Sequence, residues 1–167
     1  MISSGKREGQ TLIETALILF LLLLILLGIT EFARAWYTKS SLKNAARQGA
    51  RVAAVTPITN LPTAPFFCTP TMTCPNSDAI VNAVCCQPGV RPPAKTPPAV
   101  VSASLSCTSC TGVPPTCSSV DCSSIVADDT VQVTVSYADP TFFILGNTPW
   151  PWPKSLSIST DASMRYE

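Results

Sequence analysis

The sequence predicts the α+β fold class: a long N-terminal transmembrane helix followed by a small antiparallel β-sheet domain that disulfide bonds stabilise. Three observations lead to this prediction. An almost unbroken apolar run extends from Thr15 to Thr30, strand-like alternation occurs only in the second half of the chain, and eight cysteines all follow residue 67. A chain of 167 residues is long enough for one domain in addition to the helix.

Composition excludes several classes of function. The formal net charge is +1, so the chain lacks the basic excess of nucleic-acid-binding proteins, and we expect no nucleic-acid partner. The chain has no histidine, which removes histidine-based acid–base catalysis, Ser–His and Cys–His nucleophile pairs, and the commonest metal ligand. We therefore expect a protein that is not an enzyme and that holds no cofactor and no metal.

The apolar run spans a membrane only if its N-terminal flank is included. Thr15 to Thr30 contains 16 uncharged residues, or about 24 Å of helix, which is shorter than the roughly 30 Å hydrocarbon core. A start at Thr11 gives 20 residues and brings the carboxylate of Glu14 to the edge of the membrane. Acidic residues in such segments usually have a partner, although Glu14 can also snorkel at the interface beside Lys6 and Arg7.

A small residue stands before the apolar run rather than after it. A secretory signal has its cleavage site after the apolar region, so a cut after Gly9 would instead keep the helix in the mature chain. The stretch Gly9 to Glu14 resembles the prepilin peptidase site of type IV-like pilins, in which cleavage follows the glycine and the fifth mature residue is Glu. This resemblance implies a leader peptide over residues 1–9, processing between Gly9 and Gln10, and a prepilin peptidase as partner.

A longer stretch, Gln10 to Val55, resembles the TadE-like family, pseudopilins of the Tad (Flp) pilus machinery. The matching pieces are Glu14-Thr15-Ala16-Leu17, the leucine run, Gly28 to Ala35 and Asn44 to Arg51, with weaker matches at Val131 to Tyr137 and Ala162 to Arg165. The resemblance implies a pilin-like helix, and partners among other pilins, pseudopilins and pilus assembly proteins. It also implies that Glu14 acts in assembly by pairing with the new α-amine of Gln10 on a neighbouring subunit.

The helix is predicted to continue beyond the membrane and to end at Thr56-Pro57, because the residue before a proline disfavours helical angles. Trp36 and Tyr37 follow the apolar run, at the position of an interfacial aromatic anchor. Two stripes extend along this part of the helix. The basic residues Lys39, Lys43, Arg47 and Arg51 recur every fourth position, which is typical of a solvated face. The small residues Ala46, Gly49, Ala50 and Ala53 favour close helix packing, on the protein's own sheet or on neighbouring subunits.

The predicted domain arrangement is a leader over residues 1–9, a transmembrane and extended helix over 10–56, and an extracytoplasmic Cys-rich α+β domain over 57–167. In that domain Asn76-Ser77-Asp78 predicts the start of a short helix over Ala79 to Val84. Strands are predicted over Val100 to Leu105, over Thr130 to Tyr137, and from Leu156 to Ser159 and on toward Met164. Clusters of proline divide the rest of the region before Asp129 into short loops.

The cysteines predict structural disulfides. They are Cys68, Cys74, Cys85, Cys86, Cys107, Cys110, Cys117 and Cys122, an even number that allows about 105 connectivities. Two other interpretations concern the last four, which fit a four-thiolate zinc site, and Cys107-Thr108-Ser109-Cys110, which has the spacing of a redox pair. Disulfides are favoured because cysteine density suits an oxidising compartment, and because Gly112 to Pro115 offers no helix start to activate a thiol.

Two remaining groups are weaker candidates. Asp121, Asp128 and Asp129 match no known calcium-ligand spacing, and the last two are expected to form a turn. Trp150 to Pro153 is either an aromatic docking surface or a lid over the sheet.

Two indications of orientation disagree. Basic residues are more frequent after the apolar run than before it, which favours a cytoplasmic C-terminal side. The cysteines favour an oxidising compartment for that side, and the leader resemblance implies a cytoplasmic N-terminus. We therefore expect a single-pass protein of the bacterial inner membrane, with its C-terminal domain in the periplasm or in a surface pilus.

The resulting functional hypothesis is a membrane-anchored minor pseudopilin of a Tad/Flp-type pilus or a related secretion apparatus. The alternatives are a stand-alone membrane-anchored binding or adhesion module, and a tethered thiol oxidoreductase that uses Cys107 and Cys110.

Overall fold

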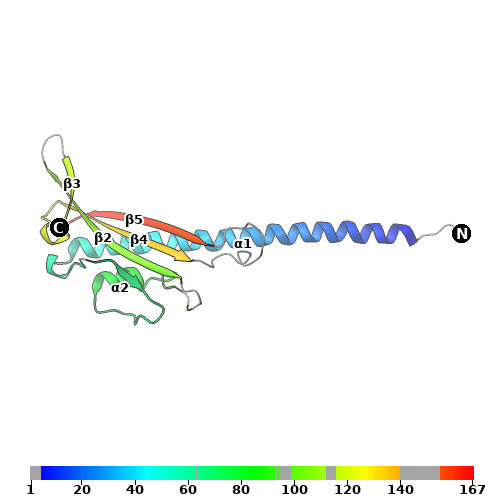
Figure 1. Ribbon diagram of the computed structural model, residues 1–167, viewed down its shortest axis with the longest axis horizontal. Helices are drawn as coiled ribbons and strands as arrows, with labels where there is room; N and C mark the ends of the chain where they lie inside the picture. The colour runs from blue at the N-terminus through cyan, green and yellow to red at the C-terminus, as the bar shows by residue number, and fades with distance from the viewer. Residues whose placement is uncertain (1–4, 63, 93, 95–98, 112–115, 140–154) are drawn as a thin grey trace. The chain divides into compact units, whose positions relative to one another are not determined.

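The computed structural model describes residues 5–62, 64–92, 94, 99–111, 116–139 and 155–167. Its elements follow one another as α1 (Gly5–Val55), η1 (Ile58–Asn60), β1 (Phe66–Cys68), α2 (Ala79–Cys85), β2 (Val100–Thr111), β3 (Thr116–Val120), η2 (Cys122–Ser124), β4 (Thr130–Asp139) and β5 (Leu156–Arg165). The predicted α+β class is confirmed: a long apolar N-terminal helix is combined with an antiparallel sheet (Figure 1).

The chain divides into two compact units, Met1–Trp36 and Tyr37–Glu167, and α1 contributes to both. The first unit is the apolar part of α1. The second unit contains the rest of α1 and every other element. Helix α1 ends at Val55, directly before the Thr56-Pro57 pair that predicts its end.

The sheet has the strand order β1-β2-β4-β5, and β3 pairs with β2 beside the short strand β1. All pairings are antiparallel. Strands β4 and β5 pair without interruption from Thr130↔Arg165 to Asp139↔Leu156. Side chains alternate between two faces in this register, and Val131, Val133 and Val135 point into the core, where each is fully buried.

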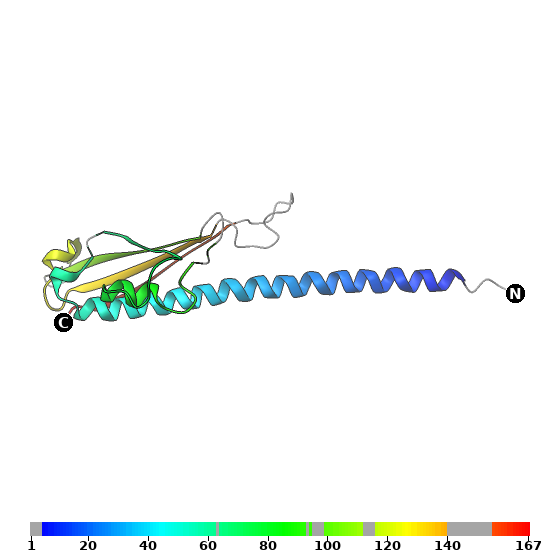
Figure 2. The same ribbon diagram turned by 90° about the horizontal axis from the view of Figure 1, so that it is seen from below.

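The core of the second unit lies between this valine face and the C-terminal part of α1. Helix residues buried there include Leu42, Ala45, Ala46, Ala50 and Ala53, all with no exposed surface. Both views show the end of α1 lying against the sheet, with α2 beside it (Figure 1, Figure 2). Small side chains on α1 allow its backbone to come close to the strands.

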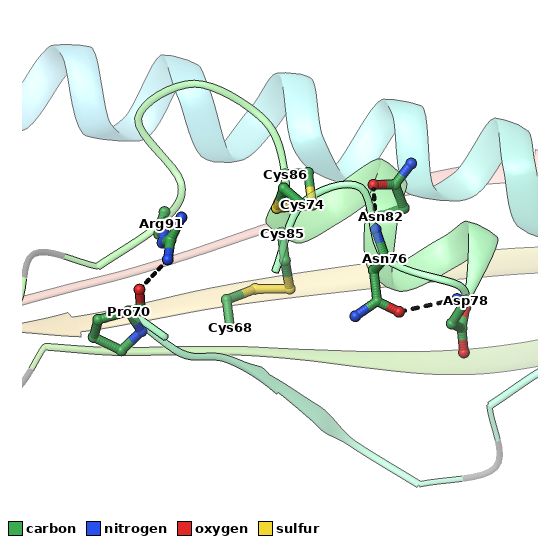
Figure 3. Close-up of a disulfide and its surroundings, with 9 residues drawn as sticks. All are labelled: Cys68, Pro70, Cys74, Asn76, Asp78, Asn82, Cys85, Cys86 and Arg91. Carbon is green, nitrogen blue, oxygen red and sulfur yellow. Dashed lines mark hydrogen bonds between the residues drawn. A yellow bond between two sulfur atoms is a disulfide. The ribbon is translucent and has the colours of Figure 1, made fainter. Parts of the chain in front are cut away.

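Helix α2 begins where its cap predicts. The side chain of Asp78 accepts hydrogen bonds from the backbone N–H groups of Ile80 (2.9 Å) and Val81 (3.2 Å), which satisfies donors that the first turn of a helix leaves free. Asn76 braces the cap, since its Oδ1 accepts from the N–H of Asp78 and its own N–H donates to Oδ1 of Asn82 (Figure 3).

All eight cysteines are paired, so the prediction of structural disulfides is confirmed. The pairs are Cys68–Cys85, Cys74–Cys86, Cys107–Cys122 and Cys110–Cys117. The first two join β1 and the loop after it to the end of α2 (Figure 3). The other two link β2 to η2 and to β3.

Strand β2 is longer than predicted, and neither β1 nor β3 has a counterpart among the predicted strands. Residues Cys107 to Thr111 and β3 up to Ser119 are small and mostly polar, so they lack the apolar alternation that predicts a strand. Cys110 and Cys117 are directly opposite each other in the ladder, and their disulfide fixes the hairpin from within.

Candidate membrane anchor and assembly segment

The first unit presents its apolar side chains to the outside. Among the described residues, one helical stretch, Gly9–Val55, contains a segment that is long and apolar enough, by length and composition, to cross a membrane. Its large apolar side chains from Leu12 to Ile29, apart from the half-buried Leu27, are each at least half exposed. Because an apolar surface of this size is not stable in water, it indicates contact with a membrane or with other helices.

Hydroxyl groups in this segment are satisfied by the helix itself. The hydroxyl of Thr15 donates to the carbonyls of Thr11 (2.9 Å) and Leu12 (3.0 Å), and that of Thr30 donates to Leu27 (2.8 Å). Such internal bonds allow polar side chains to enter hydrocarbon, where no water replaces a missing partner.

The residues of the predicted processing and assembly site lie on the exposed surface of α1. Gly9, Gln10 and Glu14 are all helical and exposed, and a Cβ added at Gly9 would have nothing within 4 Å. Gln10 and Glu14 are four residues apart, so they share a helix face about 6 Å apart along the axis. Within the described part of the chain Glu14 has no hydrogen-bond or ion-pair partner, so its carboxylate is available to a second molecule.

Aromatic and charged side chains mark the C-terminal end of the first unit. The rings of Phe32 and Trp36 are 6.1 Å apart between centroids, and both are largely exposed. Glu31 and Arg34 form an ion pair of 3.6 Å. Exposed aromatic side chains beside an apolar run have the position of an interfacial anchor.

The small residues predicted to pack have a different location from the processing site. Ala46, Gly49, Ala50 and Ala53 all belong to the second unit, where they are buried. Gly49 faces α2 and β4, because a Cβ at that position would approach Val84 and Val133. In this structure the small residues serve packing within one chain, while Gly9, Gln10 and Glu14 are exposed on the apolar unit.

The residues of the redox and zinc interpretations do not form a site of either kind. Cys107 is bonded to Cys122 and Cys110 to Cys117, rather than to one another. All four cysteines of the zinc interpretation are therefore in disulfides. Among the described residues, no three His, Cys, Asp or Glu side chains are grouped so that they can hold a metal ion. A shallow depression of about 410 Å³ between β2 and η2 contains one carboxylate, Asp121.

The three aspartates of the calcium interpretation have separate structural roles. Asp121 caps η2 by accepting from the N–H of Ser123, and the buried Asp129 accepts from the N–H of Val126. Asp128 has a positive φ of 77°, as in the expected turn, and pairs with Arg165 at 3.5 Å. The Trp150 to Pro153 segment lies outside the described residues.

Fold and anchor together define a class: proteins with one N-terminal helix of the membrane-anchor type and a disulfide-stapled α+β domain. Within that class, the model of the family described as TadE-like protein matches residues 9–51 of this chain. The match covers about a quarter of the sequence, all of it in α1, and begins at Gly9. No curated protein and no solved structure matches the chain.

Proposed function

We propose that this protein is a membrane-anchored pseudopilin that takes part, without catalysis, in assembling a Tad/Flp-type pilus or a related secretion apparatus. One observation carries the proposal: the family match over residues 9–51 coincides with an exposed apolar helix in which Gly9 precedes, and Glu14 begins, the membrane segment. A minor role in initiating, capping or regulating the filament fits a chain whose Cys-rich domain is much larger than its anchor.

The proposed mechanism begins with cleavage after Gly9 by a prepilin peptidase. Cleavage gives Gln10 a charged α-amine at the start of the helix. An unpaired carboxylate at the edge of the hydrocarbon is costly in free energy. Pairing with that amine on a neighbouring subunit therefore stabilises the carboxylate of Glu14. The net energy of such a pair is small because desolvation opposes it, and its effect is to set the register between helices.

The C-terminal domain then stands on the extracytoplasmic side. Four disulfides support this orientation, because such bonds form and persist in oxidising compartments. The basic residues that follow the apolar run favour the opposite orientation, and the disulfides have more weight here because the fold incorporates all eight cysteines.

The proposal is tested by intact mass and N-terminal sequencing of the protein isolated from its native membrane. We expect the wild-type chain to begin at Gln10, and a Gly9→Ala variant to begin at Met1. Gly28→Ala is the matched control, since both glycines lie in α1 with nothing within 4 Å of an added Cβ, and its processing should be normal. A wild-type chain that retains Met1 in cells with an active peptidase contradicts the proposal and leaves an anchored extracellular module.

A further inference from the structure

The charged residues on the outer face of α1 in the second unit are all basic. Lys39, Lys43, Arg47 and Arg51, here called the basic stripe, are all exposed, and no Asp or Glu occurs between Tyr37 and Val55. Within the described part of the chain the four side chains have no hydrogen-bond or ion-pair partner. Their spacing of four residues keeps them within one-third of the helix circumference over about 18 Å of axis.

Carboxylates gather instead at the end of the unit where α1 stops. Asp121, Asp128 and Glu167, here called the acidic end, are exposed, and Asp128 also pairs with Arg165 at 3.5 Å. Asp121 caps η2, which packs against η1 shortly after the end of α1. Backbone bonds tie the region together: the N–H of Glu167 donates to the carbonyl of Ala54 (3.1 Å), and that of Asp128 donates to the carbonyl of Tyr166 (3.0 Å). Both views show the C-terminus beside the end of α1 (Figure 1, Figure 2).

The two surfaces are complementary, and among the described residues no ion pair joins them within one molecule. The middle of the basic stripe, between Lys43 and Arg47, lies about ten residues before Val55, or about 15 Å along the helix axis. Copies that follow one another in an assembled filament point the same way. A second copy displaced by that distance along the axis brings its acidic end opposite the first copy's stripe. Opposite charges then meet along the contact, and complementary charge of this kind fixes register and orientation.

We propose that the basic stripe of one copy binds the acidic end of a second, parallel copy that is displaced by about 15 Å along α1. The contact is heterologous, so each copy keeps one free stripe or one free acidic end and can add a further copy. This inference rests on the proposed assembly function and supplies it with a contact in the extracytoplasmic domain, separate from Glu14.

The test uses the full-length protein in cells that assemble the filament, with a photo-crosslinking amino acid in place of Asn44. This residue is exposed and lies next to Lys43 and one turn from Arg47. We expect a crosslinked dimer whose second chain is joined within residues 121–129 or 165–167, as mapped by mass spectrometry. The same photo-crosslinker at Ser159, exposed on the outer face of β5, is the control position and should give no such product.

Charge variants test the chemistry of the contact. Lys43→Gln with Arg47→Gln should lower the dimer yield about fivefold, while Ser157→Glu with Ser159→Glu, which changes the net charge equally, should leave it unchanged. Lys43→Glu with Arg47→Glu should abolish the dimer, and adding Asp128→Lys with Glu167→Lys to the same chain should restore it. Non-reducing peptide mapping confirms that each variant retains its four disulfides.

Several outcomes overturn the proposal: absence of a dimer, a crosslink to another part of the second chain, adducts with anionic lipid alone, or failure of the charge swap to restore the dimer. N-terminal processing is measured in the same samples. Normal processing without the Asn44 crosslink rejects the charged contact and leaves the pseudopilin proposal intact. An unprocessed chain with a normal crosslink rejects the pseudopilin proposal instead.

Discussion

Gly49 brings α1 against both α2 and β4 because it has no side chain. A Cβ at this position would lie 2.6 Å from Cγ2 of Val84 and 3.3 Å from Cγ1 of Val133, and both valines are fully buried. Glycine thus lowers the helix propensity of α1 at this position but allows close packing. This role can be recognised only from the positions of the neighbouring elements.

We expect Gly49→Ala to destabilise the domain, although alanine favours the helix by about 1 kcal/mol. The overlap with Val84 forces the packed side chains apart, at a cost of about 1–3 kcal/mol, and Gly49→Leu should cost more. Thermal unfolding of the full chain in detergent, followed by near-UV circular dichroism, measures the change. Gln48→Ala, at the exposed neighbouring position, is the control. A higher melting temperature for Gly49→Ala would contradict the packing described here.

At the scale of single elements, local patterns predicted the elements that carry strong local signals. Asp78 was expected to cap a short helix, and it does so through two backbone N–H groups. The alternating valines of β4 are likewise readable from the sequence, because burial on one face requires a period of two. Strand β3 has no such signal, since its pairing depends on a disulfide with β2 and on few apolar contacts.

The disulfides should differ in their contribution to stability. Cys68–Cys85 has a sequence separation of 17 and is buried, whereas Cys110–Cys117 has a separation of 7 and is exposed. Chain entropy alone assigns them about 3 and about 2.5 kcal/mol, and replacing the buried pair also perturbs the core. We expect Cys68→Ala with Cys85→Ala to lower the melting temperature more than Cys110→Ala with Cys117→Ala.

The same two disulfides should be reduced one before the other, because they differ in solvent accessibility. A thiolate must reach the sulfur that it attacks, so the exposed Cys110–Cys117 bond should be reduced before the buried Cys68–Cys85 bond. Differential alkylation with mass spectrometry, at increasing concentrations of reductant, follows both pairs in one sample. Earlier reduction of Cys68–Cys85 would be inconsistent with its burial in the folded domain.

At the scale of the whole molecule, anchoring and assembly should be separable. We expect Glu14→Gln to leave membrane insertion intact, because an amide is less costly in hydrocarbon than a carboxylate, and to reduce association between copies. Carbonate-resistant membrane retention and co-purification of two differently tagged copies measure the two effects. Thr15→Val is the control, since that hydroxyl donates to carbonyls of its own helix. Equal co-purification of wild-type and Glu14→Gln copies would exclude Glu14 from assembly.

The processing and assembly residues can be predicted from the sequence, but the acidic end cannot. Gly9, Gln10 and Glu14 follow from their order along one helix, which needs no knowledge of the rest of the fold. The acidic end did not follow, because Glu167 is far in sequence from Asp121 and Asp128 and comes close to them only where β5 ends beside α1. The basic stripe was visible from its spacing, but its complement was not.

The local sequence alone is sufficient to predict the apolar anchor, the end of α1, the capped helix α2 and the valine strand. Each of these depends only on neighbouring residues and on one periodicity. The pairing of eight cysteines and the partners of Gly49 need the assembled domain. The contacts of Gly49 with α2 and β4, and the disulfides between separate elements, have energies that arise only in the folded domain. The β3 hairpin is local, but its residues lack the apolar alternation that predicts a strand.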